Sequence, residues 1–202
     1  MKTTDLFESF TTNINQELLK NKGDYIASGT FADVFSSKDP DQTAIKQIRD
    51  GFYDPAFNYW VNEIVKNNLR QKNPTFPRFY NIKLENNKVI GAEMEKLTEL
   101  RLLSDEQKEQ LFVYIFGISR NDYHVPLDRF IEDLLPKMIV QQINKGVSSI
   151  KNQNIKNACK IVNKLLMRLG EFEVGLDLHV ENMMARIYKY GVQLVVADPF
   201  VM

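Results

Sequence analysis

The chain has 202 residues, of which 44% are hydrophobic and 26% are charged. This composition is typical of a folded globular protein, and the length allows one sizeable core or two small lobes. Because 26 Lys and Arg side chains balance 26 Asp and Glu side chains, the net charge gives no reason to expect binding to nucleic acid or to an anionic membrane.

The first residues and the cysteine content indicate a cytoplasmic protein. Residues 1–19 lack the basic start and the apolar run of a signal peptide. No apolar run approaches membrane-spanning length. The single cysteine, Cys159, cannot form an internal disulfide, which suits a reducing compartment. We expect it to be a buried apolar residue of a helix. The sequence has no Cys/His cluster of the zinc-binding type.

Apolar residues at helical spacing predict a helix near the N-terminus, within residues 1–22. Thr4 or Asp5 is positioned to cap this helix. The pattern then becomes strand-rich over residues 23–97, which we expect to form one lobe.

A glycine-bearing loop and a lysine dominate the start of this lobe. Strands are expected over residues 25–37, with a loop at Gly29, and over residues 43–48, which include Lys46. Two strands joined by such a loop, with a lysine inside the next strand, indicate a cover for phosphate groups with a cation behind it.

A helix with an apolar stripe is predicted next. The stripe consists of Phe57, Trp60, Val61, Ile64 and Val65. Glu63 lies about 60° from Trp60 on a helical wheel of roughly 100° per residue, at the margin of the stripe. Its carboxylate can therefore point inward.

The lobe is predicted to end with a hairpin, and the rest of the chain to be mainly helical. Strands over residues 78–84 and 88–94 are joined by a turn at residues 85–87. A strand-rich part followed by a helical part predicts an α+β fold in two lobes, with a cleft at the join near Leu97.

Three helical patterns follow the join. Residues 104–107 form a capping-box start, and a second pattern over residues 126–143 is expected to be kinked or split at Pro136. A third runs over residues 154–169. With the residues that follow them, these patterns make up a minimal helical lobe, residues 98–202.

The last part of the chain carries the chemistry. Asp177 is followed five residues later by Asn182, and an apolar hairpin then leads to Asp198. Phosphoryl transfer from a magnesium nucleotide needs one carboxylate facing the acceptor hydroxyl and hard oxygen ligands around the metal. The spacing fits this requirement.

These motifs together resemble those of the protein-kinase-like superfamily. Residues 27–34 look like a glycine-rich loop, residues 44–46 look like the family's strand-three lysine motif, and residues 95–97 look like a hinge. The matching set, in the family's order, consists of Gly29, Lys46, Glu63, Asp177, Asn182 and Asp198. Two of the three loop glycines are replaced, by Ala27 and Ala32.

The resemblance implies roles for particular residues. Asp177 would orient or deprotonate the acceptor hydroxyl, Glu63 would pair with Lys46, and Asn182 and Asp198 would bind Mg²⁺. The nucleotide-binding residues would be Ala27, Ser28, Gly29, Thr30, Phe31, Val34, Ala44, Lys46, Met94, Glu95 and Leu97. ATP and Mg²⁺ are therefore the expected cofactors.

The catalytic loop departs from the common kinase form. Residues 177–182 read Asp-Leu-His-x-x-Asn, and Asp198 is followed by Pro199. This form is most similar to atypical minimal kinases, notably the early serine/threonine kinases of podophages, and also to aminoglycoside and choline kinases. We expect His179 to orient the loop by hydrogen bonding to backbone or to a carboxylate.

Three functions remain open. The first is a minimal Ser/Thr protein kinase of phage or effector type, acting on a host protein in the host cytoplasm and possibly on itself. The others are a small-molecule kinase and a pseudokinase that binds a partner. Transfer of the nucleotide part of ATP also stays open. The sequence given ends soon after Phe200, so an activation segment is not expected unless the chain is a portion of something longer.

Overall fold

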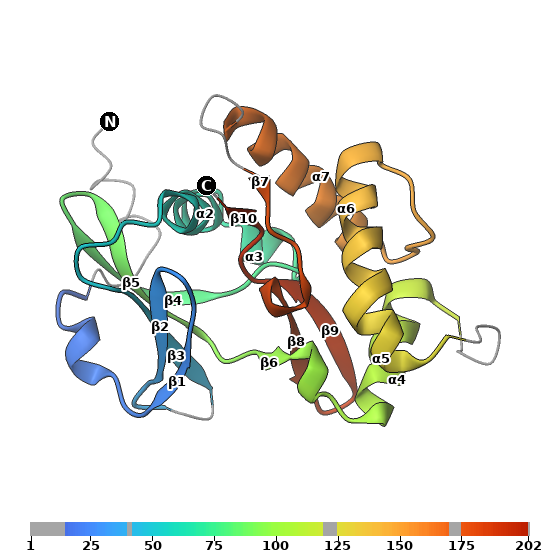
Figure 1. Ribbon diagram of the computed structural model, residues 1–202, viewed down its shortest axis with the longest axis horizontal. Helices are drawn as coiled ribbons and strands as arrows, with labels where there is room; N and C mark the ends of the chain where they lie inside the picture. The colour runs from blue at the N-terminus through green and yellow to red at the C-terminus, as the bar shows by residue number, and fades with distance from the viewer. Residues whose placement is uncertain (1–14, 40–41, 119–124, 170–174, 202) are drawn as a thin grey trace. The chain divides into compact units, whose positions relative to one another are not determined.

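The computed structural model describes residues 15–39, 42–118, 125–169 and 175–201 (Figure 1). The chain divides into two units. The first comprises residues 1–72 and 77–96, and the second comprises residues 73–76 and 97–202. The fold is α+β, as predicted: the first unit is built on an antiparallel sheet, and helices make up much of the second.

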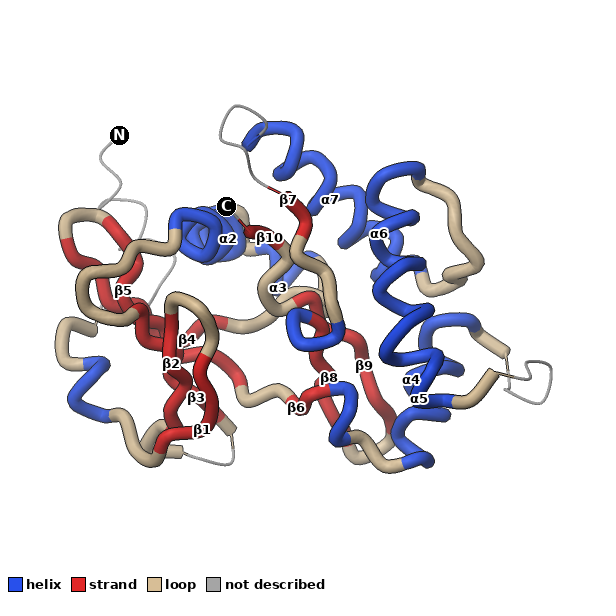
Figure 2. Tube along the Cα trace, viewed as in Figure 1, coloured by secondary structure: helices blue, strands red, loops and turns tan. Residues whose placement is uncertain are grey.

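The first unit is a five-stranded antiparallel sheet with strand order β1-β2-β3-β5-β4 (Figure 2). Its strands are β1 (Tyr25–Ser28), β2 (Ala32–Ser36), β3 (Thr43–Ile48), β4 (Phe79–Glu85) and β5 (Lys88–Glu95). The strand predicted over residues 43–48 is confirmed. β3 lies at the centre of the sheet, between β2 and β5.

The predicted turn between β4 and β5 is confirmed. Asn86 and Asn87 both have positive φ, 49° and 62°. Two successive left-handed residues form the type I′ turn whose twist matches that of a two-stranded hairpin, and Asn tolerates this conformation better than most residues.

Helix α2 (Pro55–Lys66) packs on this sheet. Asp54 caps it by accepting a hydrogen bond from the Phe57 backbone N–H at 2.8 Å, and Pro55 occupies the first turn, where no N–H is needed. Phe57 and Val61 are fully buried in a cluster with residues of β2–β5. Each such side chain stabilises the unit by roughly 1.5–3 kcal/mol through burial. A short helix, α3 (Leu69–Lys72), follows.

Most of the predicted N-terminal helix, residues 1–14, lies outside the described residues. The described remainder forms only one 3₁₀ turn, η1 (Leu18–Asn21). Leu18 is buried, and a Cβ atom on Gly91 would lie 2.9 Å from Leu19 Cδ2. This turn is therefore fixed by packing against β5 and not by continuing as an α-helix.

The second unit contains several helical segments. They are η2 (Leu100–Leu102), α4 (Asp105–Phe116), α5 (Leu127–Arg129), the π-helical turn η4 (Phe130–Leu134), α6 (Leu135–Lys145), α7 (Gln153–Leu169) and the 3₁₀ turn η5 (Val180–Asn182). The predicted capping box is confirmed, because Ser104 and Gln107 exchange side-chain and backbone hydrogen bonds. None of the described helices is both long and apolar enough to cross a membrane.

The predicted break near Pro136 is confirmed, and it takes the form of the π-helical turn. Proline has no backbone N–H and cannot donate to the carbonyl four residues earlier. The wider η4 turn comes directly before α6, in which Pro136 occupies the first turn. π-Helical turns of this kind are accommodated inside longer helices.

The strands of the second unit form two small sheets. They are β6 (Thr98–Glu99), β8 (Met183–Tyr188) and β9 (Gly191–Val196) in one, and β7 (Gly175–Leu176) with β10 (Phe200–Val201) in the other. Arg186 on β8 is buried and donates to the carbonyls of Pro74 and Phe76 at 2.6 Å and 3.2 Å. This side chain holds residues 73–76 in the second unit.

Candidate active site

Asp177 and Asn182 are held together by side-chain contacts. The Asn182 side-chain amide donates to the Asp177 backbone carbonyl at 2.7 Å and to its carboxylate Oδ2 at 2.9 Å. Both residues are half-buried. Because the Nδ2 atom is used on Asp177, the Oδ1 atom is the one through which Asn182 can bind a cation.

The backbone brings Asp198 to the same place. The Asn182 carbonyl accepts from Ala197 N at 3.0 Å and from Asp198 N at 3.5 Å. The Asp177 N–H donates to the Pro199 carbonyl at 2.9 Å. The three residues singled out in the sequence of this region therefore lie in one hydrogen-bonded cluster.

Local strand pairing explains why the segments meet. Leu176 of β7 pairs with Phe200 of β10, and the β8–β9 hairpin returns the chain to Asn182. The apolar residues of β9 are buried and anchor the hairpin in the core. Polar residues at the ends of these strands are thus held by a rigid support.

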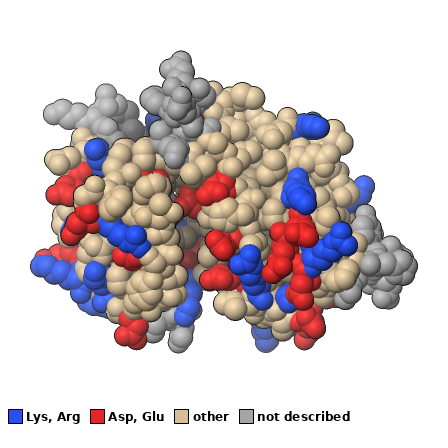
Figure 3. Space-filling view, in the orientation of Figure 1, with Lys and Arg blue, Asp and Glu red and all other residues tan. Residues whose placement is uncertain are grey.

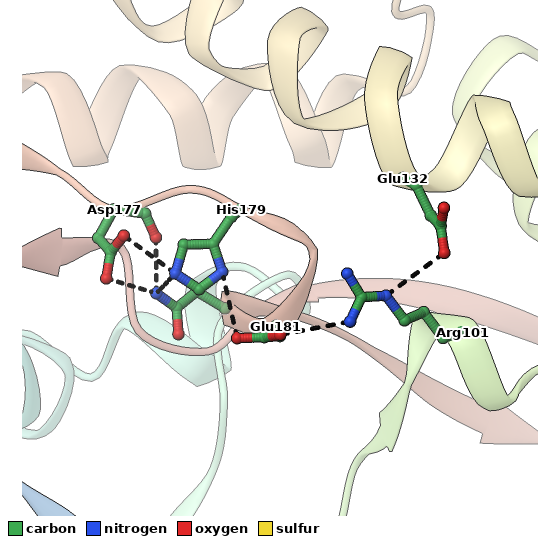
Figure 4. A network of polar contacts seen from close by, with 6 residues as sticks. Arg101, Glu132, Asp177, His179 and Glu181 are labelled. Atoms are coloured by element: carbon green, nitrogen blue, oxygen red, sulfur yellow. Dashed lines mark hydrogen bonds and ion pairs between the residues drawn. The ribbon is translucent and has the colours of Figure 1, made fainter. Parts of the chain in front are cut away.

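A row of polar contacts runs from Asp177 to Glu132 (Figure 4). His179 Nε2 lies 3.1 Å from Asp177 Oδ1, and His179 Nδ1 lies 3.8 Å from Glu181 Oε2. Glu181 Oε1 lies 3.3 Å from Arg101 Nη1, and Arg101 Nε lies 3.4 Å from Glu132 of η4. His179 therefore orients the Asp177 carboxylate, as expected, while Arg101 and Glu132 tie the loop to η2 and η4.

Sequence reasoning missed Arg101, Glu132 and Glu181 as members of this network. Arg101 and Glu181 are 80 residues apart, and each is an ordinary charged residue of an exposed segment. No local spacing or composition marks such a pairing, because it depends on how the elements pack.

In the first unit, the predicted phosphate cover is a tight hairpin between β1 and β2. Gly29 N donates to the Ala32 carbonyl at 2.8 Å. Neither Gly29 nor the two alanines at the lost glycine positions, Ala27 and Ala32, has positive φ. The backbone conformation of this loop is therefore accessible to alanine as well as to glycine.

Arg49 braces this loop. Its guanidinium donates to Asp33 at 2.7 Å and to the Thr30 carbonyl at 3.3 Å, and it also bonds the Ser28 hydroxyl. The Arg49 hydrogen bond, followed by that of Ser28, lowers the pKa of the Asp33 carboxyl below its usual value. The loop residues Ser28 and Thr30 are thus fixed from one side by a cation that sequence reasoning missed.

In the first unit, Lys46 is half-buried on β3 and Glu63 is buried on α2. Lys46 lies opposite Val34 of β2 and Ala92 of β5, and its ammonium group is 3.9 Å from the centroid of the Phe57 ring on α2. Glu63, on the same helix, is 9% exposed and accepts from Asn67 Nδ2 at 2.7 Å. The Lys46 ammonium group therefore lies against α2, and Glu63 is a buried carboxylate of the same helix.

The predicted hinge residues are divided between the units. Met94 and Glu95 end β5, where Met94 pairs with Ala44 and the Glu95 N–H donates to the Arg78 carbonyl at 3.0 Å. Leu97 belongs to the second unit. Of the other residues proposed for the nucleotide, Phe31 contacts the Phe52 ring with a centroid distance of 6.3 Å.

The donor set at Asn182 and Asp198 fits Mg²⁺ bound together with phosphate. Mg²⁺ in nucleotide enzymes is held by one or two side-chain oxygens, with phosphates and water supplying the rest. The Asn182 amide oxygen and the Asp198 carboxylate, on segments joined by backbone hydrogen bonds, provide two such side-chain oxygens. Within the described ranges, no three His, Cys, Asp or Glu side chains gather into a site that could hold a metal by themselves.

Comparison with known proteins gives remote likenesses. No protein-family model and no curated protein matches the chain. One similar structure is APH(2″)-IIa in a ternary complex with streptomycin and ATP, at 14% identity and a TM-score of 0.37, covering 97% of this chain and 70% of that one. A second is the aminoglycoside phosphotransferase APH(2″)-Ib bound to ADP, at 13% identity and a TM-score of 0.32, covering 96% of this chain and 72% of that one.

A third similar structure is the choline kinase LicA from Streptococcus pneumoniae, at 13% identity and a TM-score of 0.35, covering 98% of this chain and 69% of that one. At these TM-scores the likenesses are too remote to assign an activity. The function is therefore inferred from the residues of this chain.

Proposed function

We propose that the protein is an ATP-dependent phosphotransferase of the protein-kinase-like type, which moves the γ-phosphoryl group of ATP to a hydroxyl group. The observation that carries the proposal is the hydrogen-bonded cluster of Asp177, Asn182 and Asp198. It unites a carboxylate suited to an acceptor hydroxyl with two oxygen ligands suited to a hard cation.

Asp177 would bind the acceptor. Its carboxylate accepts a hydrogen bond from the hydroxyl group and takes the proton as the oxygen attacks the γ-phosphorus. A bond forms between the acceptor oxygen and phosphorus, the bond from phosphorus to the β,γ-bridging oxygen breaks, and ADP leaves. His179 at 3.1 Å from Oδ1 and Asn182 at 2.9 Å from Oδ2 fix both carboxylate oxygens.

The other residues would bind the nucleotide. Asn182 and Asp198 would hold Mg²⁺, which neutralises the charge developing on the phosphate oxygens. Lys46 would supply a cation from β3, and its ammonium group lies over the Phe57 ring. Glu63 on α2 would restrain Lys46, as the resemblance to kinases implies.

For the acceptor we propose a Ser or Thr hydroxyl of a protein. Residues 135–169 contain no Asp or Glu, so helices α6 and α7 offer no carboxylate to recognise a cationic small molecule. A small-molecule kinase is the second candidate, favoured by the Asp-Leu-His-x-x-Asn form of residues 177–182 and by the contact of His179 with Asp177.

The experiment supplies ATP labelled at either the α or the γ phosphate, with Mg²⁺ and three acceptor sets: mixed proteins, aminoglycosides with choline, and none. Transfer of the γ label to protein Ser or Thr supports the proposal. Transfer only to small molecules supports the second candidate. Transfer of the α label would mean nucleotidylation, and ATP binding without any transfer would point to a pseudokinase; either result contradicts the phosphotransferase proposal.

A further inference from the structure

A groove of about 360 Å³ lies on the second unit, between α6 and the catalytic loop. Its lining comes from one side of α6, from Pro136 to Lys145, and from Leu178. A volume near the lower end of the usual range for ligand sites suits a few side chains better than a large folded surface.

Leu178 connects the groove to the chemistry. It stands between Asp177 and His179 in the sequence, and its side chain is 7% exposed. Consecutive Cα atoms are about 3.8 Å apart. A molecule seated against Leu178 therefore contacts the residue next to Asp177 in the catalytic loop.

The groove presents two rows of side chains along α6. Pro136 and Val140 are four residues apart and give an apolar row, while Lys137, Gln141, Asn144 and Lys145 give a polar row with a cation at each end. Residues at four-residue spacing lie on one side of a helix. The site thus combines an apolar floor with two ammonium groups on one flank.

The sequence of α6 and α7, which surrounds the groove lining, is also positively charged. The basic residues of 135–169 are Lys137, Lys145, Lys151, Lys156, Lys160, Lys164 and Arg168, and the same range contains no acidic residue. Helix α7 packs on α6, and the Asn163 side chain bonds the Ile143 carbonyl. The chain as a whole is neutral, so this concentration of one sign is local.

The lining of the groove contains no carboxylate, although acidic residues lie nearby in the chain. Glu132 and Asp133 precede α6, but neither lines the groove, and Glu132 is paired with Arg101 at 3.4 Å. The face drawn in Figure 3 carries both acidic and basic side chains. The charged side chains that line the groove, Lys137 and Lys145, are both cationic and therefore favour a partner with negative charge.

We propose that this groove binds the acceptor protein through an acidic segment that carries an apolar side chain. The inference rests on the proposed phosphotransferase function and specifies its acceptor. Carboxylates of the segment pair with Lys137 and Lys145, and its apolar side chain packs on Val140 and Leu178. A hydroxyl residue nearby in the segment then reaches Asp177, whereas a cationic acceptor is repelled.

The test measures binding of fluorescein-labelled peptides to the full chain by anisotropy, without nucleotide. One peptide contains Glu, Leu and Ser; matched peptides replace Glu with Gln or with Lys. We expect the acidic peptide to bind most tightly, and its affinity to fall by about tenfold or more in the Lys137→Glu/Lys145→Glu variant. Added salt is expected to weaken binding, because the contacts are exposed.

The control variant is Lys66→Glu/Lys189→Glu, which reverses the same number of charges on exposed residues outside the groove. It should retain most of the affinity. Equal binding of the three peptides, equal losses in both variants, or tighter binding of a single-stranded RNA of the same charge would each overturn the proposal. Mg²⁺-ATP binding and γ-phosphoryl transfer are measured separately, so failure of the groove is distinguishable from failure of the proposed function.

Discussion

The Asn182 side chain donates to the Asp177 carboxylate at 2.9 Å, while the Asn182 backbone carbonyl accepts from Asp198 N at 3.5 Å. One asparagine thus links the carboxylate proposed for the acceptor with the carboxylate proposed for the metal. Each of these contacts fixes a group before substrate binds, which lowers the cost of organising the site during reaction.

His179 is expected to act as a positioning residue for Asp177. In His179→Ala the carboxylate loses the contact at 3.1 Å, so kcat for phosphoryl transfer should fall about tenfold while KM for ATP stays unchanged. His179→Gln, which can still donate to the carboxylate, should recover part of the rate. Steady-state kinetics of both variants test this, and an equal loss of kcat in the two would contradict it.

Gly29→Ala is expected to leave stability unchanged and to weaken ATP binding. A Cβ at Gly29 would lie 3.8 Å from the Ala32 carbonyl, an ordinary contact, but it would crowd phosphate groups close to the loop. Gly23→Ala is the matched control, because its Cβ would lie 2.5 Å from Ser36 Oγ. Thermal melting should show a lower Tm for Gly23→Ala only, and ATP titration should show weaker binding for Gly29→Ala only. A large loss of Tm in Gly29→Ala would refute the prediction.

Arg186→Met is expected to lower the free energy of unfolding by about 2–4 kcal/mol, because buried carbonyl acceptors lose a charged donor. The affected contacts are those to Pro74, Phe76 and the Gln193 side chain at 2.6 Å. Urea unfolding measures the change. The exposed Arg129→Met serves as control, with an expected change within about 0.5 kcal/mol. Similar values for both variants would rule out the anchoring role.

Cys159 is expected to make the protein less stable in alkali. Burial raises the pKa of its thiol to about 12, whereas the unfolded thiol ionises near pH 8.5. Between these values the unfolded state binds fewer protons, so stability falls as pH rises, by at most about 1.4 kcal/mol per pH unit from this group. Urea midpoints at about pH 8 and about pH 10 measure the slope. Cys159→Ala should show a shallower slope; identical slopes would disprove the contribution.

Local signals in the sequence predicted much of the fold. The strand over residues 43–48, the turn at Asn86 and Asn87, and the cap at Ser104 each depend on neighbouring residues, and the structure agrees with them. Cys159 is buried on α7 as expected. Such features follow from backbone preferences that a short window contains.

Long-range features were not predictable in this way. The placement of residues 73–76 in the second unit depends on Arg186, more than a hundred residues later. The bracing of the loop by Arg49 and the link from Arg101 to Glu181 also join distant segments. At the candidate site, the spacing of Asp177 and Asn182 suggested their proximity, but the tie to Asp198 needed the paired strands β7 and β10.

The most direct test of the central claim measures γ-phosphoryl transfer from labelled ATP as Mg²⁺ is titrated, for the wild type, Asp198→Ala and Asn182→Ala. The matched control is Asp105→Ala, which removes an exposed carboxylate elsewhere in the second unit. We predict Mg²⁺-dependent transfer by the wild type and the control, and a loss of about a hundredfold or more in the two site variants while they remain folded. Transfer that persists in Asp198→Ala, or that needs no divalent cation, would contradict the assignment of this cluster as the phosphoryl-transfer centre.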